Sequence, residues 1–410
     1  MHLMFWDTLL AFAALVTLPG TIELLIVSAG ALIAAASGPS LSRIGSHQLP
    51  GPMVTVVPAH NEAGGIAATL RSLLAANPAE SGSSVVVVAD NCSDNTADIA
   101  RAEGVRVLER HSETHRGKGY ALDFAFRELL PENPEAFIVV DADASVQPGF
   151  FRAFREGFDA GADALQCAYL LTEGHTRREA MQELAFSCFN FSRPLARDGL
   201  GLSCGILGNG FGLRASTLSA TPYTAASIVE DLEYHLQLVR SGKRVRFLAN
   251  TVLRSPMPTR HEAAISQRAR WEGGRLGIAA RLGPRMAVEV WNGNWRCLEP
   301  LLDLLLLPLG YHVVVLATML LASSLGSETG LLQSMLGELA WLGVAAVGAH
   351  LATAFLSPHI GVRHAAGLAE APEYLVWKLR ALGAILAGAR SNAAWVRTHR
   401  DQQPPGDDSS

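Results

Sequence analysis

The sequence contains little lysine, no cysteines spaced as CxxC and no excess of positive charge. Lysine accounts for three of the 33 basic residues, and 38 acidic residues leave a formal net charge of −5. This balance gives no general attraction for a polyanion, so we expect no nucleic-acid partner. The five cysteines, odd in number and without paired spacing, argue against a zinc site and indicate a reducing compartment.

Charged residues are also scarce, at 17% of the chain against 49% hydrophobic residues. The apolar residues collect toward the two ends. Residues 9–36 form a nearly uncharged stretch with no basic segment before it, which predicts a transmembrane helix rather than a signal peptide. Glu23 interrupts this stretch, and because a carboxylate is costly in lipid we expect it to face another helix.

Two further stretches, residues 301–323 and 331–356, are long enough to span a membrane. The hairpin between them carries no Lys or Arg, whereas residues 363–400 carry six. By the positive-inside rule, that tail and the domain between the spans are cytoplasmic. We therefore expect a multi-pass protein of the bacterial inner membrane with three spans. Residues 366–395 are basic on one side and predict a helix that lies against membrane lipids at the interface.

Between these ends, strands alternate with helices. Apolar runs typical of buried strands occur at residues 54–58, 84–90, 137–140 and 164–171. The alternation predicts an α/β domain with a parallel sheet, whose binding residues lie at the carboxyl ends of strands. We divide the chain into a transmembrane helix (1–36), a linker (37–52), a cytoplasmic α/β domain (53–260), a long helix followed by interfacial helices (261–300), two transmembrane helices (301–356), a basic interfacial helix (357–400) and a disordered tail (401–410).

The central feature of the α/β domain is a pair of acids, Asp141 and Asp143, directly after a buried apolar strand. Their spacing in an extended segment puts both carboxylates on one side of the chain. Like charges raise each other's pKa unless a cation lies between them. A divalent cation such as Mg²⁺ or Mn²⁺, shared with a phosphorylated substrate, satisfies this requirement. An isolated pair of acids with this spacing more often marks only the turn at the end of a strand. Here Asp90 lies at the end of another strand, and this second acid favours the metal-site interpretation.

A competing interpretation of the acid pair is a phosphatase of the haloacid-dehalogenase type, in which the first Asp is the nucleophile. Those enzymes place the motif after the first strand of the domain. Here at least three strands precede it, and no later acid pair clearly completes the metal site. We therefore consider the phosphatase the weaker hypothesis.

Other polar residues fall where they can complete a site for a nucleotide-activated substrate. His60 and Glu62 follow the first strand and can line a nucleoside pocket with Asp90. Lys118 can hold the base or a phosphate, although a loop lysine is equally often only solvated. The glycine-rich residues 205–212 are not spaced as GxGxxG, so they predict a close approach of backbone to ligand and no dinucleotide fingerprint.

Two later segments supply candidates for the chemical step. Asp231 can accept a proton from an acceptor hydroxyl, although Glu230 and Asp231 also suit the first turn of a helix for electrostatic reasons. A helix over residues 262–280 carries Arg270, which can neutralise phosphate, and Trp271, which can stack on a sugar. An Arg–Trp pair on a helix is more often one surface residue and one core residue, with no part in catalysis.

Taken together, these residues resemble family 2 glycosyltransferases with the GT-A fold, of the membrane-embedded polysaccharide-synthase type. The resemblance covers about residues 54–271. It is carried by a series of motifs in the family's order: Val57-Pro-Ala-His-Asn-Glu62, Asp90, Asp141-Ala-Asp143, Glu230-Asp231 and Gln267-Arg-Ala-Arg-Trp271.

The resemblance implies an inverting hexosyltransferase-type reaction with Asp231 as general base and Mg²⁺ or Mn²⁺ on Asp141 and Asp143. It also implies contacts with a nucleotide-sugar, often a UDP-sugar. These donor contacts are expected from His60, Glu62, Asp90, Lys118, Asp141, Gln267, Arg270 and Trp271. The acceptor is expected beside Asn209, Gly210, Glu230 and Trp271.

Two departures limit the analogy. Val229 precedes Glu230 where processive synthases frequently have Thr, and three spans are fewer than those synthases use. The leading hypothesis is transfer to a growing exo- or cell-surface polysaccharide. Single-sugar transfer to a lipid-linked acceptor, such as a polyprenyl phosphate or glycolipid, remains open, as does a non-catalytic nucleotide-sugar-binding scaffold. An export or polymerase partner, or a homo-oligomer, would be needed to complete a channel.

Overall fold

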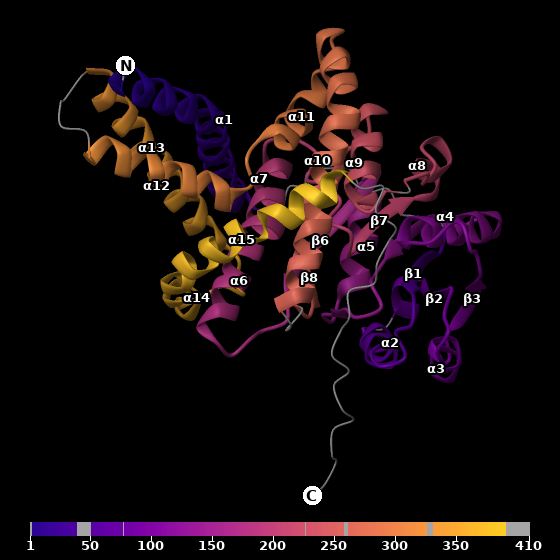
Figure 1. Ribbon diagram of the computed structural model, residues 1–410. Helices are drawn as coiled ribbons and strands as arrows, with labels where there is room; N and C mark the ends of the chain where they lie inside the picture. The colour runs from indigo at the N-terminus through magenta and orange to yellow at the C-terminus, as the bar shows by residue number, and fades with distance from the viewer. Residues whose placement is uncertain are drawn as a thin grey trace, which may run out of the picture. The chain divides into compact units, whose positions relative to one another are not determined.

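The computed structural model describes residues 2–38, 51–76, 78–225, 227–257, 261–325 and 331–390 (Figure 1). The chain divides into two compact units. The helical unit comprises Met1–Gly38, Glu173–Gly201 and Leu301–Gly383. The sheet unit comprises Pro39–Thr172, Leu202–Pro300 and Ala384–Ser410.

The sheet unit is built on one eight-stranded sheet with the order β3-β2-β1-β4-β7-β6-β8-β5. The strands are β1 (Met53–Ala59), β2 (Ser83–Asp90), β3 (Arg106–Arg110), β4 (Ala136–Val139), β5 (Ser145–Val146), β6 (Ala164–Leu171), β7 (Phe211–Arg214) and β8 (Val245–Ser255). Strands β3, β2, β1 and β4 are mutually parallel, and β6 is parallel to β8. Their carboxyl ends therefore meet at one edge, as the alternation of strands and helices predicts.

The sheet departs from the predicted parallel arrangement at two strands. Strand β7 runs antiparallel to both β4 and β6, and β5 runs antiparallel to β8. Neither strand has a long apolar run: β5 has two residues and β7 has four, the first two of which belong to the glycine-rich segment. A sequence pattern that depends on long buried strands cannot detect such short ones.

Helices cover the sheet and fill its core with aromatic side chains. They are α2 (Ile66–Ala75), α3 (Thr96–Ala102), α4 (Lys118–Leu129), α5 (Phe150–Asp159), α8 (Ala215–Ala220), α9 (Glu230–Arg240) and α10 (His261–Trp291). Phe154 and Phe158 of α5 are fully buried against β7, where a Cβ on Gly212 would lie 2.9–3.0 Å from their rings. Helix α5 begins directly after Gly149.

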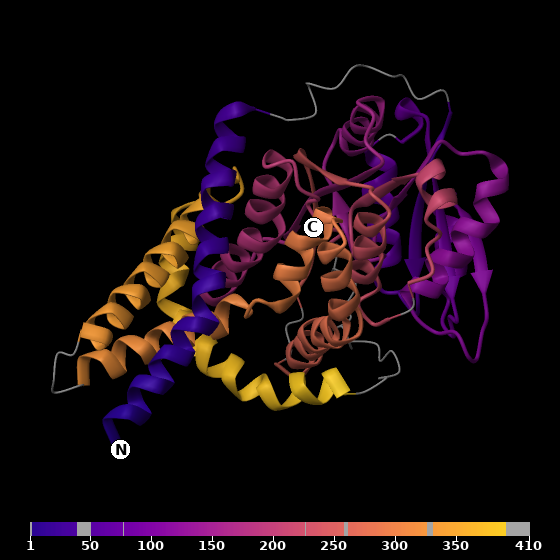
Figure 2. The ribbon, with the colours of Figure 1, turned by 90° about the horizontal axis from the view of Figure 1, so that it is seen from above.

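The helical unit contains α1 (His2–Ser37), α6 (Arg177–Ser187), a π-helical turn (Cys188–Ser192) and α7 (Arg193–Gly199). It also contains α12 (Leu309–Leu325), α13 (Leu331–Thr353) and α14 (Val362–Gly367), while α11 (Leu298–Leu305) and α15 (Ala371–Arg390) run across its boundaries. Helices α1, α12 and α13 pack side by side (Figure 2).

Two described helical segments, Leu10–Ser37 and Ser334–Leu356, are long and apolar enough to cross a membrane. The span expected at residues 301–323 is instead broken. Residues Trp295–Leu305 and Leu309–Ser324 form a bent pair with an angle of 63° between them. Pro308 lies in this break, and a proline removes a backbone hydrogen bond from any helix that would continue through it. The expected helix at 366–395 is seen as α14 and α15, with residues after 390 outside the described part.

A partly buried group of four charges connects three segments of the helical unit. Arg193 of α7 pairs with Glu23 of α1 and, at 2.7 Å, with Asp303 of α11. Arg197, one turn further along α7, lies 3.1 Å from Asp303. These side chains are only 9–23% exposed. The prediction that Glu23 faces another helix is therefore confirmed, and its charge is compensated inside the unit.

Removing one member of this group should destabilise the protein. Arg193→Met leaves two partly buried carboxylates with one guanidinium, and such losses typically cost about 3–5 kcal/mol. Arg106→Met is a matched control, because the Arg106–Glu132 pair is about half exposed and should contribute less than about 1 kcal/mol. Thermal unfolding in detergent should give a clearly lower midpoint for Arg193→Met alone. Equal midpoints would mean that the group does not hold these helices together.

Candidate functional site

The ends of the parallel strands bring the predicted residues together at one edge of the sheet. His60 follows β1 and Asp90 ends β2, and the His60 Nδ1 atom lies 2.7 Å from the Asp90 carbonyl oxygen. Asp141 follows β4, whose residues pair in parallel with β1. The acids and His60 therefore come from adjacent strands, as expected for a ligand site on a parallel sheet.

Asp90 is almost fully buried and carries a partner that the sequence analysis did not identify. The guanidinium of Arg110, the last residue of β3, pairs with the Asp90 carboxylate and also donates to the His115 carbonyl oxygen at 2.7 Å. The two side chains are only 7% and 12% exposed. Asp90 and Arg110 are direct partners in the parallel register of β2 and β3. Knowing the register between these two strands would have identified Arg110. Its strand is short, however, and shows little alternation of polar and apolar residues, so the register cannot be read from the sequence.

Two asparagines fix the loops that carry these residues. Asn61 and Asn91 follow β1 and β2 in equivalent left-handed conformations, with φ of 54° and 52°. The Asn61 side chain accepts a hydrogen bond from the Ser93 N–H at 2.7 Å, and that of Asn91 accepts one from the Ser112 N–H at 2.8 Å. Each loop is thus tied to the next. This series holds His60 and Asp90 in place, and a Glu62 N–H···Thr96 Oγ1 bond of 2.8 Å adds to it.

Lys118 is the positive centre of the site. It is the first residue of α4, and its ammonium donates to the Asp141 carboxylate and to the Gly208 carbonyl oxygen. Burial alone would lower the pKa of Lys118, but the Asp141 carboxylate and the nearby Glu230 and Asp231 outweigh it and leave the pKa raised. The sequence left open whether Lys118 is functional or only a solvated loop residue. In the structure it is partly buried among acids.

Glu230 and Asp231 begin α9 beside this lysine. Burial raises the pKa of both carboxyl groups, and for Glu230 the charge of Asp231 adds to the effect. Gly208 has a φ of +81°, and a Cβ on it would lie 2.9 Å from Asp231 Oδ2. The absence of a side chain at Gly208 therefore lets the backbone approach Asp231 closely. The predicted approach of this segment to a ligand stays a prediction.

Asn209 and Gly210 are buried in the same segment. The Asn209 Oδ1 atom accepts the Asp141 N–H at 3.0 Å, and its Nδ2 donates to Ser255 Oγ at 3.1 Å. Gly210 has a φ of +67°, and a Cβ there would clash with Cys167 Sγ. Asn209 thus fixes Asp141 relative to the end of β8. An acceptor contact of Asn209 and Gly210 stays a prediction.

The segment Gln267 to Trp271 lies on α10, and the side chains of Gln267, Arg270 and Trp271 are half-buried there. Three residues further on, a Cβ on Gly274 would lie 2.7 Å from Val229, directly before Glu230. The helix therefore packs beside the acids. None of the three side chains is a described hydrogen-bond or ion-pair partner of Lys118 or Asp231, so their roles stay predictions.

Asp141 and Asp143 could hold a metal ion of a particular kind. Asp143 is half-buried in the turn directly after Asp141. Within the described residues, no group of three or more His, Cys, Asp or Glu side chains is arranged as a metal site. Two carboxylates without a third protein ligand suit Mg²⁺ or Mn²⁺, which take their other ligands from water and substrate phosphates, and do not suit structural zinc.

Comparisons with known proteins agree with this geometry. Residues 50–274 match the family model described as glycosyltransferase-like family 2. An uncharacterised protein of Methanocaldococcus jannaschii is 40% identical over 93 residues, which are 23% of this chain and 36% of that protein. The chain thus spans about a third of the length of this curated relative.

Solved structures with a similar fold include a mannosyltransferase from Pyrobaculum calidifontis in complex with GDP-Man and Mn²⁺. It has a TM-score of 0.53 and 18% identity, covering 83% of this chain and 99% of that one. Glucosyl-3-phosphoglycerate synthase from Mycobacterium tuberculosis, in complex with Mn²⁺, UDP and phosphoglyceric acid, has a TM-score of 0.38 and 17% identity, covering 63% and 83%. The first of these similarities establishes the fold.

The position of Asn209 predicts a measurable loss of stability. Asn209→Ala leaves the Asp141 N–H without its partner in a partly buried place, and an unsatisfied buried donor typically costs about 1–3 kcal/mol. Asn95→Ala is the control, since Asn95 is exposed and makes no side-chain cap bond at the start of α3. Unfolding followed by circular dichroism should show a lower midpoint for Asn209→Ala and no change for Asn95→Ala. Identical curves for the two variants would refute this role of Asn209.

Proposed function

Because the chain belongs to glycosyltransferase-like family 2, we propose that it transfers a sugar from a nucleotide-sugar to an acceptor hydroxyl with inversion. The observation that carries this proposal is the convergence of carboxylates from separate segments on one ammonium. Asp141 pairs with Lys118, and the acids that begin α9 lie close enough to raise its pKa. Such a site combines positive charge for a diphosphate with a carboxylate for proton transfer.

Asp231 is the proposed general base. Burial raises its pKa, which makes its carboxylate a better proton acceptor than an exposed Asp. As the acceptor oxygen bonds to the anomeric carbon, its proton moves to Asp231. The bond from that carbon to the donor phosphate breaks on the opposite face, and the nucleoside diphosphate leaves with the electron pair. The sugar is thereby inverted.

Asp141 and Asp143 are the proposed ligands of Mg²⁺ or Mn²⁺. When bound, the ion would offset negative charge on the leaving diphosphate. Lys118 supplies fixed positive charge at the same place, from the first turn of α4. The mannosyltransferase that shares this fold was solved with GDP-Man and Mn²⁺, which supports a nucleotide-sugar donor and this type of cofactor.

The remaining predicted residues complete the donor and acceptor sites in this proposal. His60, Glu62 and Asp90 contact the nucleoside, which the resemblance implies is often uridine. Gln267, Arg270 and Trp271 hold the diphosphate and the end of the acceptor. Asn209, Gly210 and Glu230 lie on the acceptor side, with Asn209 acting through its bond to Asp141.

We propose a place for the protein in the bacterial inner membrane, with the sheet unit in the cytoplasm and a cell-surface or exported polysaccharide as acceptor. The two helical segments long enough to cross a membrane support this placement. The same observation favours a second candidate, single-sugar transfer to a membrane lipid. The two spans among the described residues, or three with the bent pair, form a poor channel for a growing glycan without a partner or a second copy.

The first test is a panel of UDP-, GDP- and dTDP-sugars with Mn²⁺ and the detergent-purified protein, measuring nucleoside diphosphate release. One donor should give release that disappears with EDTA and in Asp143→Ala. Radiolabelled product would separate the two acceptor hypotheses, since a polymer and a single-sugar lipid differ in size. If no donor releases nucleoside diphosphate, even with glycan and lipid acceptors supplied, the result would favour a non-catalytic scaffold.

The second test concerns the base. Asp231→Asn should reduce turnover by about 10²–10⁴-fold, the range typical of general acid–base catalysis, while nucleotide binding persists. Asp98→Asn is the matched control, because Asp98 also lies in the first turn of a helix but is 81% exposed on α3. Turnover in Asp231→Asn that equals the control would show that another group takes the proton.

A further inference from the structure

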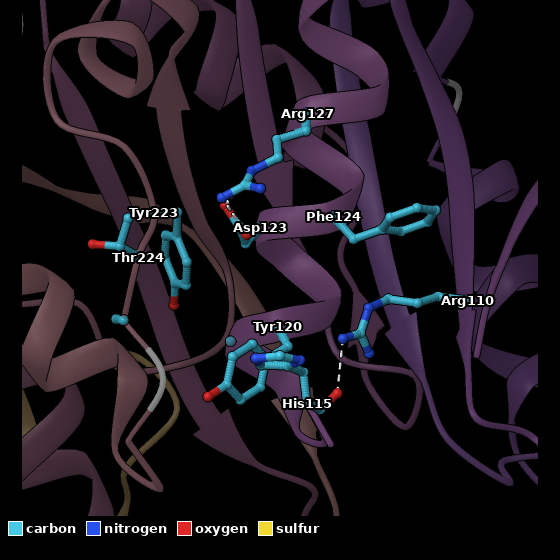
Figure 3. Close-up of a pocket in the computed structure, with 10 residues that line it drawn as sticks. Arg110, His115, Tyr120, Asp123, Phe124, Arg127, Tyr223 and Thr224 are labelled. Atoms are coloured by element: carbon cyan, nitrogen blue, oxygen red, sulfur yellow. Dashed lines mark hydrogen bonds and ion pairs between the residues drawn. The ribbon is translucent and has the colours of Figure 1, made fainter. Parts of the chain in front are cut away.

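A separate pocket lies beside the proposed active site, on the outer face of α4. It has a volume of about 420 Å³, within the range of about 300–1,000 Å³ typical of small-ligand sites. One wall is formed by Tyr120, Asp123, Phe124 and Arg127, which share one face of α4 (Figure 3). The other wall is formed by residues 223–225.

The floor of this pocket adjoins the acids of the proposed active site. Gly119 and Ala225 both line the pocket. A Cβ on Gly119 would clash with the Ala225 carbonyl oxygen and lie 3.3 Å from the Cβ of Glu230. Gly119 therefore packs closely against both Ala225 and Glu230, so it connects the pocket to the start of α9.

The pocket contains a buried polar atom that has no partner. Tyr223 is 2% exposed, and its hydroxyl makes no hydrogen bond within the described residues. Figure 3 shows its ring beside α4, with the hydroxyl directed toward the end of the pocket where Tyr120 lies. The hydroxyl has no accessible surface and lies near the Glu230 and Asp231 carboxylates, so Tyr223 connects the wall of the pocket to the proposed active site and is not itself a ligand contact.

The charges in the pocket identify the class of ligand. Its two guanidinium groups are already neutralised, that of Arg110 by Asp90 and that of Arg127 by Asp123 at 2.9 Å. A phosphate or carboxylate would gain little net attraction there. Tyr120 and Phe124 are half-buried and offer apolar ring surface beside the Asp123–Arg127 pair. Sugars match this combination, because they have apolar C–H faces and hydroxyls that both donate and accept.

We propose that the pocket is an accessory carbohydrate subsite, which binds an uncharged part of the acceptor glycan away from the reacting hydroxyl. This inference rests on the proposed function. The subsite is connected to both halves of the active site. Arg110 joins it to Asp90, and Gly119 joins it to Glu230. A bound glycan would thereby hold the acceptor near Asp231.

The test uses the full-length protein in detergent and four neutral disaccharides: cellobiose, maltose, mannobiose and N,N′-diacetylchitobiose. Binding is measured by saturation-transfer NMR. At least one disaccharide should bind, and Asp123→Asn and Tyr120→Ala should each weaken it about ten-fold or more. Asp123→Asn preserves size and leaves only the largely exposed Arg127 without its partner, so it should fold normally. Glu128→Gln, an exposed position on the same helix, should bind as the unaltered protein does.

UDP and GDP affinities, measured with Mn²⁺ in the same samples, separate this inference from the proposed function. Nucleotide affinity should be equal in Asp123→Asn and Glu128→Gln. The inference is overturned if no disaccharide binds, if binding survives both pocket variants, or if Asp123→Asn weakens nucleotide binding equally. Disaccharide binding in a protein that binds no nucleotide would reject the proposed function and, with it, the acceptor role of the pocket.

Discussion

The site depends on one ammonium group placed among carboxylates that the chain keeps far apart in sequence. Lys118 pairs with Asp141, and Glu230 and Asp231 add their charge from the start of α9. Without a cation, these partly buried acids would repel one another and α9 could not begin beside β4. The Lys118 ammonium also binds the Gly208 carbonyl oxygen. It thereby joins the end of the strand, the glycine-rich segment and the helix into one arrangement.

Backbone geometry supplies the space that this arrangement needs. Gly208 brings the backbone against Asp231, and Asn209 holds the N–H of Asp141. On the other side, left-handed Asn61 and Asn91 connect successive loops, so that Asp90 and His60 keep their positions. The site is thus rigid in its own backbone, which suits a reaction that depends on fixed charge rather than on a mobile side chain.

Much of this could be predicted from the sequence, because acids after apolar strands and at a helix start are visible as patterns. Asp90, Asp141 and the parallel half of the sheet follow from that logic, and the motif series gives the family. Arg110 was not predicted, because its role depends on the register between β2 and β3, which no local pattern encodes. Strands β5 and β7 are too short to show a period. The break at Pro308 lies inside an apolar run whose length alone predicts a span.

The central claim is that Lys118 compensates the acids of the site, and it can be tested by comparing two of the three lysines. Thermal unfolding would be measured for Lys118→Met and Lys243→Met, in EDTA and in Mn²⁺. Lys243 forms a more exposed pair with Asp163, at 31% and 39% exposure. The account predicts a much lower midpoint for Lys118→Met in EDTA and a larger gain from Mn²⁺ than in Lys243→Met, because the ion would replace the lost charge. Equal midpoints and equal gains for the two variants would contradict it.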